Sequence, residues 1–532
     1  MKKNILSFII CFIFFAPFSI LHAESEYSLR LAPVLVSPSG AEQLQTGMGV
    51  NASLDWSFFT FAEKFDLGMT FGGGFASIPV QAGNPFMLLQ GKAGPFLRWR
   101  PFDRWAVQAE FNAGIYQFSR GEDSDIKGLI GGTLGAQFHL SPYFSLFSDI
   151  GYTHRVFASK PFDTFDVILG IRFNVSEIMG SKSRVDMEKT EQYRVFPVSY
   201  AWYENNPIAT VTITNNEPNT ITDLQLTFFM NSYMTQPWTF AVVPSLGVGE
   251  SIEVPVTALF NEALINLSGI VTANGVLEMQ YRSLGAKKTT VSSVQMPIFH
   301  RNNMSWDDDR RAAAFVSPRD SAARFFARHV ASGIERAISS QQLSTRGIPS
   351  NVVYAAALFE ALRLYRINYV VDPASSYVAL SDDESEIDNL NFPYQTLSFR
   401  GGDCDDLSIL LCSLLEALNI ETAFITVPGH IFLAFEVGND SWLANNANII
   451  VHNGKRWMPL ESTVPNEGFS RSWRTGVQQW QRHRNNAAVY PIHEAWQIYP
   501  SVTVPESNDF VPEVPQWDAI VRAVDRELGN LR

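Results

Sequence analysis

One cysteine stands at the start of a leucine-rich run, in the stretch FRGGDCDDLSILLCSLLEAL of residues 399–418. The whole chain of 532 residues contains three cysteines, Cys11, Cys404 and Cys412. Leucines recur after Cys404 at helical intervals, and this spacing predicts a helix that begins near the cysteine. The unpaired N–H groups and the dipole at a helix start favour a thiolate, which is the reactive form of cysteine. Cys404 is therefore a candidate nucleophile.

A nucleophilic cysteine also needs a base and a group that orients the base. His430 opens an apolar, strand-like run, and Glu461 follows the run RWMPL at the end of a later one. His430 could instead be a core histidine, but it could equally point at the helix start. In the catalytic reading His430 takes and returns the proton, and Glu461 holds the imidazole. With protonated His430 as its partner, the Cys404 thiolate is expected to form well below pH 8.5.

Other residues near the cysteine have less specific signals. An oxyanion hole would need the Cys404 backbone N–H and one side-chain donor, for which Gln395 is a candidate; an ordinary loop residue is the alternative. The acids at 403, 405 and 406 are expected to cap the helix. Cys412 lies eight residues along the same helix, about 12 Å away. That distance exceeds the ~7 Å limit between bridged Cα atoms, so we expect two free thiols.

The stretch RGGDCDDLSILLCSLLEALNIETAFITVPGHIFLAFEV resembles the motif of the bacterial transglutaminase-like superfamily, and GKRWMPLEST resembles its strand ending in the triad acid. The resemblance covers about residues 310–470. It implies an α+β, papain-like domain whose thiol acts on amide bonds, with no metal or organic cofactor. The family's usual acid is Asp, whereas this chain has Glu461, and a polar insertion at 438–454 widens the spacing from histidine to acid. Asp440 is the alternative acid.

Charge and composition exclude some functions. The net charge of −13 argues against nucleic acid, which requires a basic face. The acidic clusters at 307–309 and 382–384 lack the spacing and glycine of a calcium loop. No cysteine pair or HExxH motif suggests zinc. We therefore predict no bound metal.

The N-terminal residues 1–23 are typical of a secretory signal peptide. They combine a basic start, an apolar core and a small-residue cleavage site at Leu21-His22-Ala23. Export of the chain follows, and removal of the signal also removes Cys11.

Residues 24–175 alternate between apolar and polar side chains in about eight segments, each near the ~10 residues that cross a bilayer as a tilted strand. The polar faces carry charges of both signs, which suits lipid outside and a polar lumen inside. The region resembles the small OmpA-like outer-membrane barrels. A soluble sandwich or a lipocalin-like barrel is the alternative. The shorter connections are expected on the periplasmic side, which would place both barrel ends and everything C-terminal in the periplasm.

Three further regions are expected after the barrel. Residues 176–192 read as a linker, and residues 193–300 contain short β-rich runs typical of an Ig-like β-sandwich, a spacer or binding module. Residues 301–500 form the transglutaminase-like domain, and 501–532 a C-terminal extension with a short helix.

These expectations give one main functional hypothesis and two alternatives. The main one is an outer-membrane-anchored, periplasmic thiol enzyme that hydrolyses amide bonds, or less favourably cross-links them. Its partners would be membrane lipid and a protein or peptide substrate, including a peptidoglycan stem. The alternatives are a non-catalytic envelope scaffold or binding protein, and an adhesin centred on the barrel. A small barrel with a charged lumen argues against a pore.

Overall fold

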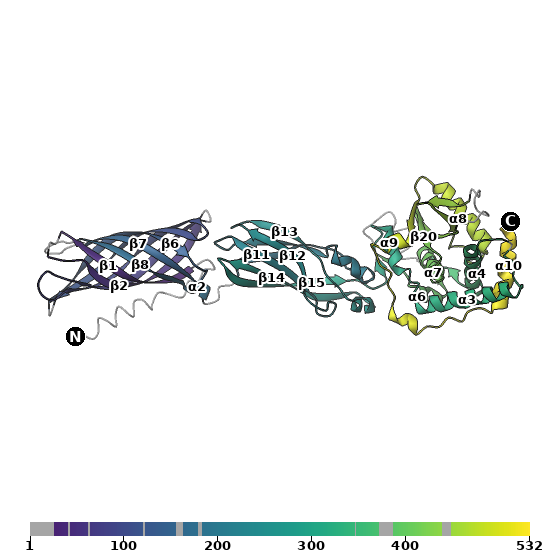
Figure 1. The fold of residues 1–532 in the computed structure, drawn as a ribbon, viewed down its shortest axis with the longest axis horizontal. Helices are drawn as coiled ribbons and strands as arrows, with labels where there is room; N and C mark the ends of the chain where they lie inside the picture. Colours follow the sequence, from purple (N-terminus) through teal and green to yellow (C-terminus); the bar gives the residue numbers. More distant parts are fainter. Residues whose placement is uncertain are drawn as a thin grey trace.

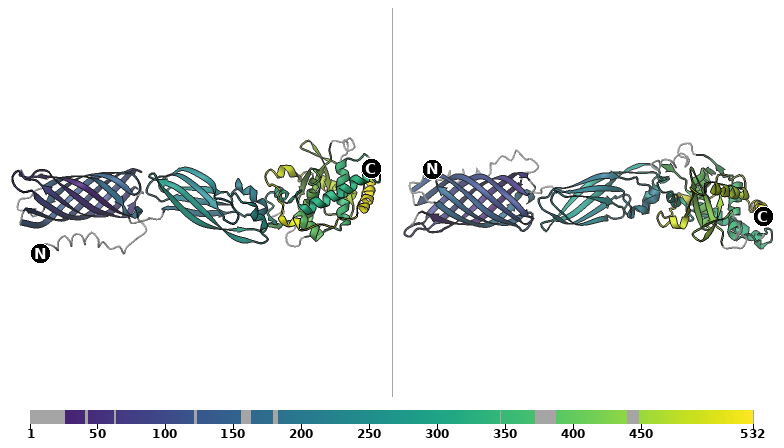
Figure 2. Two further views of the ribbon diagram at one scale, coloured as in Figure 1. Left: turned by 60° about the horizontal axis from the view of Figure 1, so that its bottom comes forward. Right: turned by 90° about the horizontal axis from the view of Figure 1, so that it is seen from above.

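The computed structural model describes residues 26–40, 43–61, 64–120, 123–155, 163–178, 183–345, 347–371, 387–438 and 448–531. Three bodies follow one another along the molecule: a barrel at one end, a two-sheet body in the middle, and a mixed helical and β domain at the other end (Figures 1 and 2). The predicted signal segment lies outside the described residues. None of the helices in the described ranges is long and apolar enough to cross a membrane.

The N-terminal body is a closed, eight-stranded antiparallel barrel, as the alternation predicts. Each strand pairs with the next, and the last pairs with the first to close the cylinder. The strands are β1 (Glu26–Ser39), β2 (Gly47–Phe61), β3 (Phe65–Ile78), β4 (Phe86–Phe102), β5 (Trp105–Arg120), β6 (Asp123–His139), β7 (Phe144–Arg155) and β8 (Asp163–Asn174).

The barrel has an apolar outside and a polar inside. In β7 the burial pattern alternates along the strand: Leu146, Ile150 and Tyr152 are exposed, whereas Asp149 and Thr153 are buried. This is the reverse of a soluble barrel such as a lipocalin, whose interior is apolar. An apolar outer surface around a polar lumen is the arrangement of barrels that lie in lipid.

Charges of opposite sign fill the lumen and pair with one another. Arg30 forms ion pairs with Glu110 and Asp149, and the Arg172 guanidinium lies 3.1 Å from a carboxylate oxygen of Asp55. The cavity lined by Arg30, Glu110 and Asp149 has a volume of about 30 Å³, close to that of one water molecule. The interior is therefore packed with polar side chains, and its charges are mutually compensated.

Large aromatic side chains gather at the barrel end that faces the middle body. They flank the short β2–β3, β4–β5 and β6–β7 turns, where membrane barrels place one of their interfacial girdles. The exposed members are Phe58, Phe59, Phe61, Trp99, Phe102, Trp105 and Phe144.

The middle body consists of a three-stranded and a four-stranded sheet, in the orders β13-β10-β9 and β12-β11-β14-β15, which share one core. Its assignment to the Ig-like class stays a prediction. The segment 176–192 is not a plain linker as expected, because its second half is strand β9, paired with β10. The strands are β9 (Val185–Gln192), β10 (Ala209–Asn215), β11 (Ile221–Phe229), β12 (Trp238–Leu246), β13 (Ser251–Val256), β14 (Val271–Ser283) and β15 (Ala286–Ile298).

Two ion pairs connect the middle body to the base of the barrel. Arg184, just before β9, lies 3.0 Å from Glu26 at the start of β1. Lys288 on β15 lies 2.8 Å from Glu177 in α2 (Val175–Ile178), the short helix that follows the barrel. The junction is therefore a contact between side chains as well as a chain connection.

The C-terminal domain packs helices against a five-stranded sheet of order β22-β23-β21-β20-β24. Every residue of α7 is buried, so this helix is the centre of the domain. Residues of α10, expected in a separate extension, belong to the same core. The main helices are α3 (Ser321–Ser339), α4 (Ser350–Leu364), α6 (Pro393–Phe399), α7 (Cys404–Glu416), α8 (Phe469–His483), α9 (Ile492–Ala495) and α10 (Trp517–Asn530). The sheet strands are β20 (Thr422–Val427), β21 (His430–Glu436), β22 (Ile450–His452), β23 (Lys455–Leu460) and β24 (Ala488–Pro491).

Candidate active site

Cys404 is the first residue of α7, as its spacing from the leucines predicts. Its side chain is 3% exposed, and its sulfur accepts a hydrogen bond from the backbone N–H of Ile431 on β21. The preceding glycines form the short strand β19 (Gly401–Gly402). A Cβ atom on Gly402 would lie 2.5 Å from the Cβ of Asp406, which is too close, so only glycine lets the chain enter the helix at this angle.

His430 lies beside the peptide that contacts the sulfur, because it is the first residue of β21. Its Nε2 atom is 2.9 Å from Oε2 of Glu461. The ring also stacks on Phe432, with 5.7 Å between centroids. The contact with Glu461 occupies Nε2 and orients the ring, so Nδ1 is the nitrogen left to exchange a proton with a thiol.

Glu461 directly follows β23, which pairs with β21 so that Leu460 lies opposite Leu433. This register brings the carboxylate to the head of β21. Its other oxygen accepts hydrogen bonds from the Thr463 backbone N–H at 3.0 Å and from the Thr463 hydroxyl at 2.7 Å. Burial acts to raise the pKa of Glu461, but the His430 hydrogen bond and charge and the Thr463 donors hold the pKa below its usual range.

For the other two predicted site residues, Gln395 and Asp440, the structure describes no contact with Cys404. Gln395 uses its amide oxygen to accept a hydrogen bond from the Phe392 N–H, which caps α6, and another from Asn302. It therefore stabilises a helix start. Asp440 lies outside the described residues.

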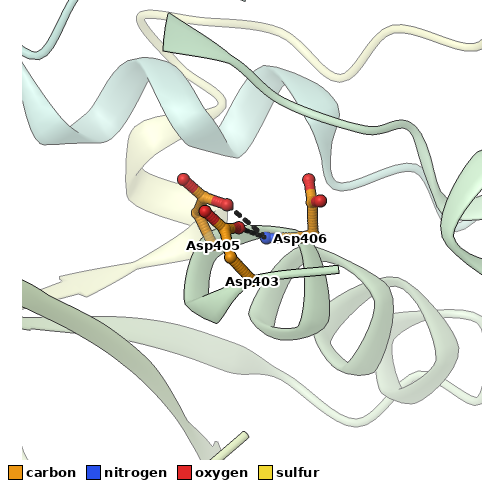
Figure 3. A group of neighbouring side chains, drawn as sticks. All are labelled: Asp403, Asp405 and Asp406. Carbon is orange, nitrogen blue, oxygen red and sulfur yellow. Dashed lines mark hydrogen bonds between the residues drawn. The ribbon is translucent and has the colours of Figure 1, made fainter. Parts of the chain in front are cut away.

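The three acids around Cys404 are buried at the start of α7, two of them close together and bonded to the same N–H (Figure 3). Asp403 is the N-cap, and Asp405 accepts a hydrogen bond from the Asp406 backbone N–H at 2.6 Å. Asp406 accepts two from Asn391, from its backbone N–H at 2.7 Å and its side-chain amide at 2.6 Å. Asp403 and Asp405 thus cap the helix as expected, whereas Asp406 binds Asn391 instead.

The same three carboxylates are close enough to share a cation, with donor atoms within 4.8 Å of one another. Both oxygens of Asp406 accept hydrogen bonds from Asn391, and one oxygen of Asp405 accepts from the Asp406 N–H. Burial and the Asp403 carboxylate raise the pKa of Asp405 well above its usual value. Burial and Asp403 also raise the pKa of Asp406 to about 7, against the Asn391 hydrogen bonds. We therefore interpret the group as a partly protonated helix cap.

The thiol itself does not have the low pKa expected of an activated nucleophile. Burial, followed by the charge of Asp403, raises the pKa of Cys404 to about 12, and the Ile431 N–H offsets only part of this effect. The expectation of a thiolate well below pH 8.5 is therefore wrong, because burial and the Asp403 charge outweigh the backbone N–H groups that face the sulfur. Any attack by this sulfur must be coupled to removal of its proton.

Cys412 is also a free thiol, as expected from its distance along the helix. It is fully buried, and burial raises its pKa too, although the Thr422 hydroxyl partly offsets this. It has a packing role.

Tyr369 is a further candidate for the site, which the sequence reasoning did not single out. It lies on β17 (Asn368–Tyr369), which pairs in parallel with β19 so that Tyr369 is opposite Gly402. Burial, followed by electrostatic interaction with Cys404, Asp403 and Glu461, raises the pKa of Tyr369 to about 12, so its hydroxyl is a neutral donor. Its side chain is 38% exposed. The available signal was the short apolar run around Tyr369 upstream of the cysteine.

Comparison with known proteins concerns the barrel. No protein-family model and no curated protein matches the sequence. Neisserial surface protein A is 10% identical, with a TM-score of 0.23, over 28% of this chain and 96% of that chain. Ail of Yersinia pestis is 20% identical, with a TM-score of 0.19, over 28% and 97%.

The N-terminal β-barrel domain of Pseudomonas aeruginosa OprF is 10% identical, with a TM-score of 0.18, over 28% of this chain and 100% of that one. The transglutaminase-like resemblance of the C-terminal domain stays a prediction.

Alkylation of the thiols tests their electrostatic environment. Because the Cys404 thiol is protonated at neutral pH, its reaction with iodoacetamide in the whole chain should accelerate about tenfold per pH unit from pH 7 to pH 10. Asp403→Asn keeps a capping oxygen but removes the charge, so its profile should shift to lower pH. Mass spectrometry separates labelling at Cys404 from labelling at Cys412, which should stay unmodified in the folded protein. A plateau below pH 8 in the parent would contradict the raised pKa.

The pH dependence of stability tests the buried acids. The pKa values of Asp405 and Asp406 are higher in the folded protein than the ordinary value of about 4. The folded state therefore holds more protons than the unfolded state above about pH 4. The stability they contribute is complete below that pH and is lost as the pH rises toward 7 and beyond.

Asp405→Asn replaces a protonated acid by an amide of the same shape. In calorimetry of the whole chain, the transition of the C-terminal domain should match the parent at pH 4 and exceed it at pH 8. Glu513→Gln, at an exposed position, is the control and should show no such difference. A lower midpoint for Asp405→Asn at pH 8 would mean that the ionised carboxylate stabilises the fold.

Proposed function

We propose that this protein is an outer-membrane-anchored thiol enzyme that hydrolyses amide bonds in the periplasm through Cys404, His430 and Glu461. The proposal rests on one observation: the first two residues of β21, His430 and Ile431, contact Glu461 and Cys404 respectively. The Ile431 N–H donates to the Cys404 sulfur, while His430 Nε2 lies 2.9 Å from Glu461. A nucleophile, a base and a carboxylate that orients the base are thus assembled on a rigid helix and sheet.

The reaction follows from this order of groups. The thiol proton passes to His430 as the sulfur attacks the amide carbonyl carbon, and the imidazolium formed is stabilised by ionised Glu461. His430 then protonates the departing amine, which leaves a thioester. Water attacks the thioester with His430 again as the base, releasing the acid and restoring the thiol. Coupled proton removal is needed here because the thiol pKa is high.

In the tetrahedral intermediate, the negatively charged carbonyl oxygen must accept hydrogen bonds from nearby donors. The Cys404 backbone N–H at the helix start is one candidate. The Tyr369 hydroxyl is the second, in place of Gln395, whose oxygen is engaged in capping α6. Because Tyr369 is partly exposed, the substrate would enter along its side of the site.

Hydrolysis is favoured over cross-linking because water is always present. The substrate would be a protein or peptide, with a peptidoglycan stem peptide as one case. These fit the proposed location, in which the domain faces the periplasm.

A non-catalytic scaffold or binding protein is the second candidate function. The observation that favours it is the environment of Cys404, which is 3% exposed and strongly protonated. In that case the His430–Glu461 pair would have only a structural role. An adhesin centred on the barrel is the remaining alternative.

The proposed membrane location rests on the barrel surface. Its outside is apolar, its lumen charges are internally paired, and an aromatic band lies at the end with the short turns. Both barrel termini are at that same end, because the number of strands is even. The middle body and the C-terminal domain would then project into the periplasm.

Substitutions at the site test the catalytic proposal. We expect Cys404→Ala to abolish peptide hydrolysis and Glu461→Gln to lower its rate on the order of 10²–10⁴-fold, because an amide cannot stabilise the imidazolium. Tyr369→Phe should lower the rate at least about tenfold. New amino termini in a peptide library are counted by mass spectrometry.

The controls are Cys412→Ala on the same helix and Glu436→Gln on the same strand as His430. Both should retain activity. Hydrolysis by Cys404→Ala at the parental rate, or none by any variant including the parent, would favour the scaffold.

Topology is tested separately on cells. Protease added to intact cells should leave residues 193–532 uncut, and cleavage should appear once the outer membrane is permeabilised. Immunoblotting with an antibody against the C-terminal domain follows the fragment. Digestion of this domain in intact cells would reverse the orientation.

A further inference from the structure

A groove lies between α3 and the start of α10, on the C-terminal domain. α10 is at the end of the molecule opposite the barrel (Figure 1). The groove has a volume of about 530 Å³, within the range of ligand sites. Its lining residues are Ser321, Arg324, Phe325, Arg328, His329, Ser332, Gly333, Arg336 and Trp517. We refer to it as the α3 groove.

The α3 groove is basic although the chain carries a net charge of −13. Arg324, Arg328 and Arg336 are all exposed on one helix. Within the described ranges, none of their guanidinium groups forms an ion pair with a carboxylate. Like charges at positions i and i+4, such as Arg324 and Arg328, destabilise a helix. This unfavourable arrangement is relieved when an anion binds between the two side chains.

Aromatic side chains form the rest of the groove. Phe325 is 45% exposed between the two arginines, and Trp517 forms the opposite wall. A Cβ atom on Gly333 would lie 3.1 Å from the Cβ of Trp517, so the glycine allows the tryptophan to approach α3 closely. The Arg336 guanidinium lies 5.7 Å from the Trp517 ring centroid, which orients its charge along the groove.

We propose that the α3 groove binds an acidic segment of a partner protein in an extended conformation. Successive carboxylates on one side of an extended chain are about 6.6 Å apart. The helical rise places Arg324 and Arg328 about 6 Å apart and Arg336 about 12 Å further. A guanidinium binds a carboxylate through two parallel hydrogen bonds. Phe325 and Trp517 offer apolar contact to the alternate side chains of such a segment.

This site is separate from the proposed active site. Cys404, His430 and Glu461 are not among the lining residues, and the buried face of α3 packs in the core that contains α7. Binding at the groove would recruit a partner protein to the domain whether or not the thiol is catalytic.

The test uses the whole chain in non-ionic detergent and a fluorescein-labelled eight-residue peptide of alternating glutamate and alanine. Anisotropy should show saturable binding that weakens with added salt. A peptide with glutamine in place of glutamate should bind at least tenfold more weakly. Equal affinity for the two peptides would overturn the proposal.

Charge reversal locates the binding surface. Arg324→Glu with Arg328→Glu should weaken binding at least tenfold, and the milder Arg324→Gln with Arg328→Gln should also weaken it, in case the first variant misfolds. Arg474→Glu makes the same kind of change at an exposed position of α8 and should leave affinity unchanged. Parental affinity in both groove variants would overturn the proposal.

Phe325→Ala should weaken binding several-fold, because it removes the apolar contact.

Competition experiments distinguish binding of an acidic peptide from binding of other anions. Vesicles containing phosphatidylglycerol, or a sulfated dextran, should compete no better than the unlabelled peptide. Binding of either of these at the groove without binding of the peptide would also contradict the acidic-segment assignment.

Discussion

The packing of α7 in the centre of the C-terminal domain is the constraint on which the candidate site depends. Because every residue of this helix is buried, its first residue has a fixed position against β21. The Ile431 N–H then meets the Cys404 sulfur, and the preceding residue, His430, is held at the same place. The pairing of β21 with β23 adds Glu461. A loose helix would leave these three groups without a common geometry.

Buried charged groups are stabilised in different ways in the barrel and in the C-terminal domain. In the barrel lumen, buried charges of opposite sign pair directly, as Arg30 does with Glu110 and Asp149. At the start of α7, three buried acids lie together, and burial and the Asp403 carboxylate raise the pKa of Asp405 and Asp406. Protonation there takes the place of ion pairing. Burial, followed by the charge of Asp403, which caps the same helix, raises the pKa of the Cys404 thiol.

The arrangement of the three bodies connects these local features to the proposed function. Ion pairs at the barrel base, such as Arg184 with Glu26, hold the middle body against the barrel end that carries the aromatic band. The middle body separates the candidate site from that end (Figure 1). A catalytic or binding domain placed in this way would reach material at a distance from the membrane, and the α3 groove lies on the same domain.

The sequence by itself determined the features that follow from local periodicity. Alternation with a period of two predicted the closed eight-stranded barrel, and leucine spacing predicted a helix beginning at Cys404. The order of Cys404, His430 and Glu461 along the chain suggested a triad, of which the structure contains the His430–Glu461 contact. Strand β9 was not predicted, because its residues, VDMEKTEQ, are mostly polar and are typical of a linker.

Tertiary structure alone decided the remaining features. The direction of the thiol pKa depends on burial and on where the Asp403 charge lies, and neither is a local property. Gln395 became a helix cap through contacts with Asn302 and Phe392. Tyr369 and the α3 groove arise where segments distant in sequence meet, as Gly333 and Trp517 do.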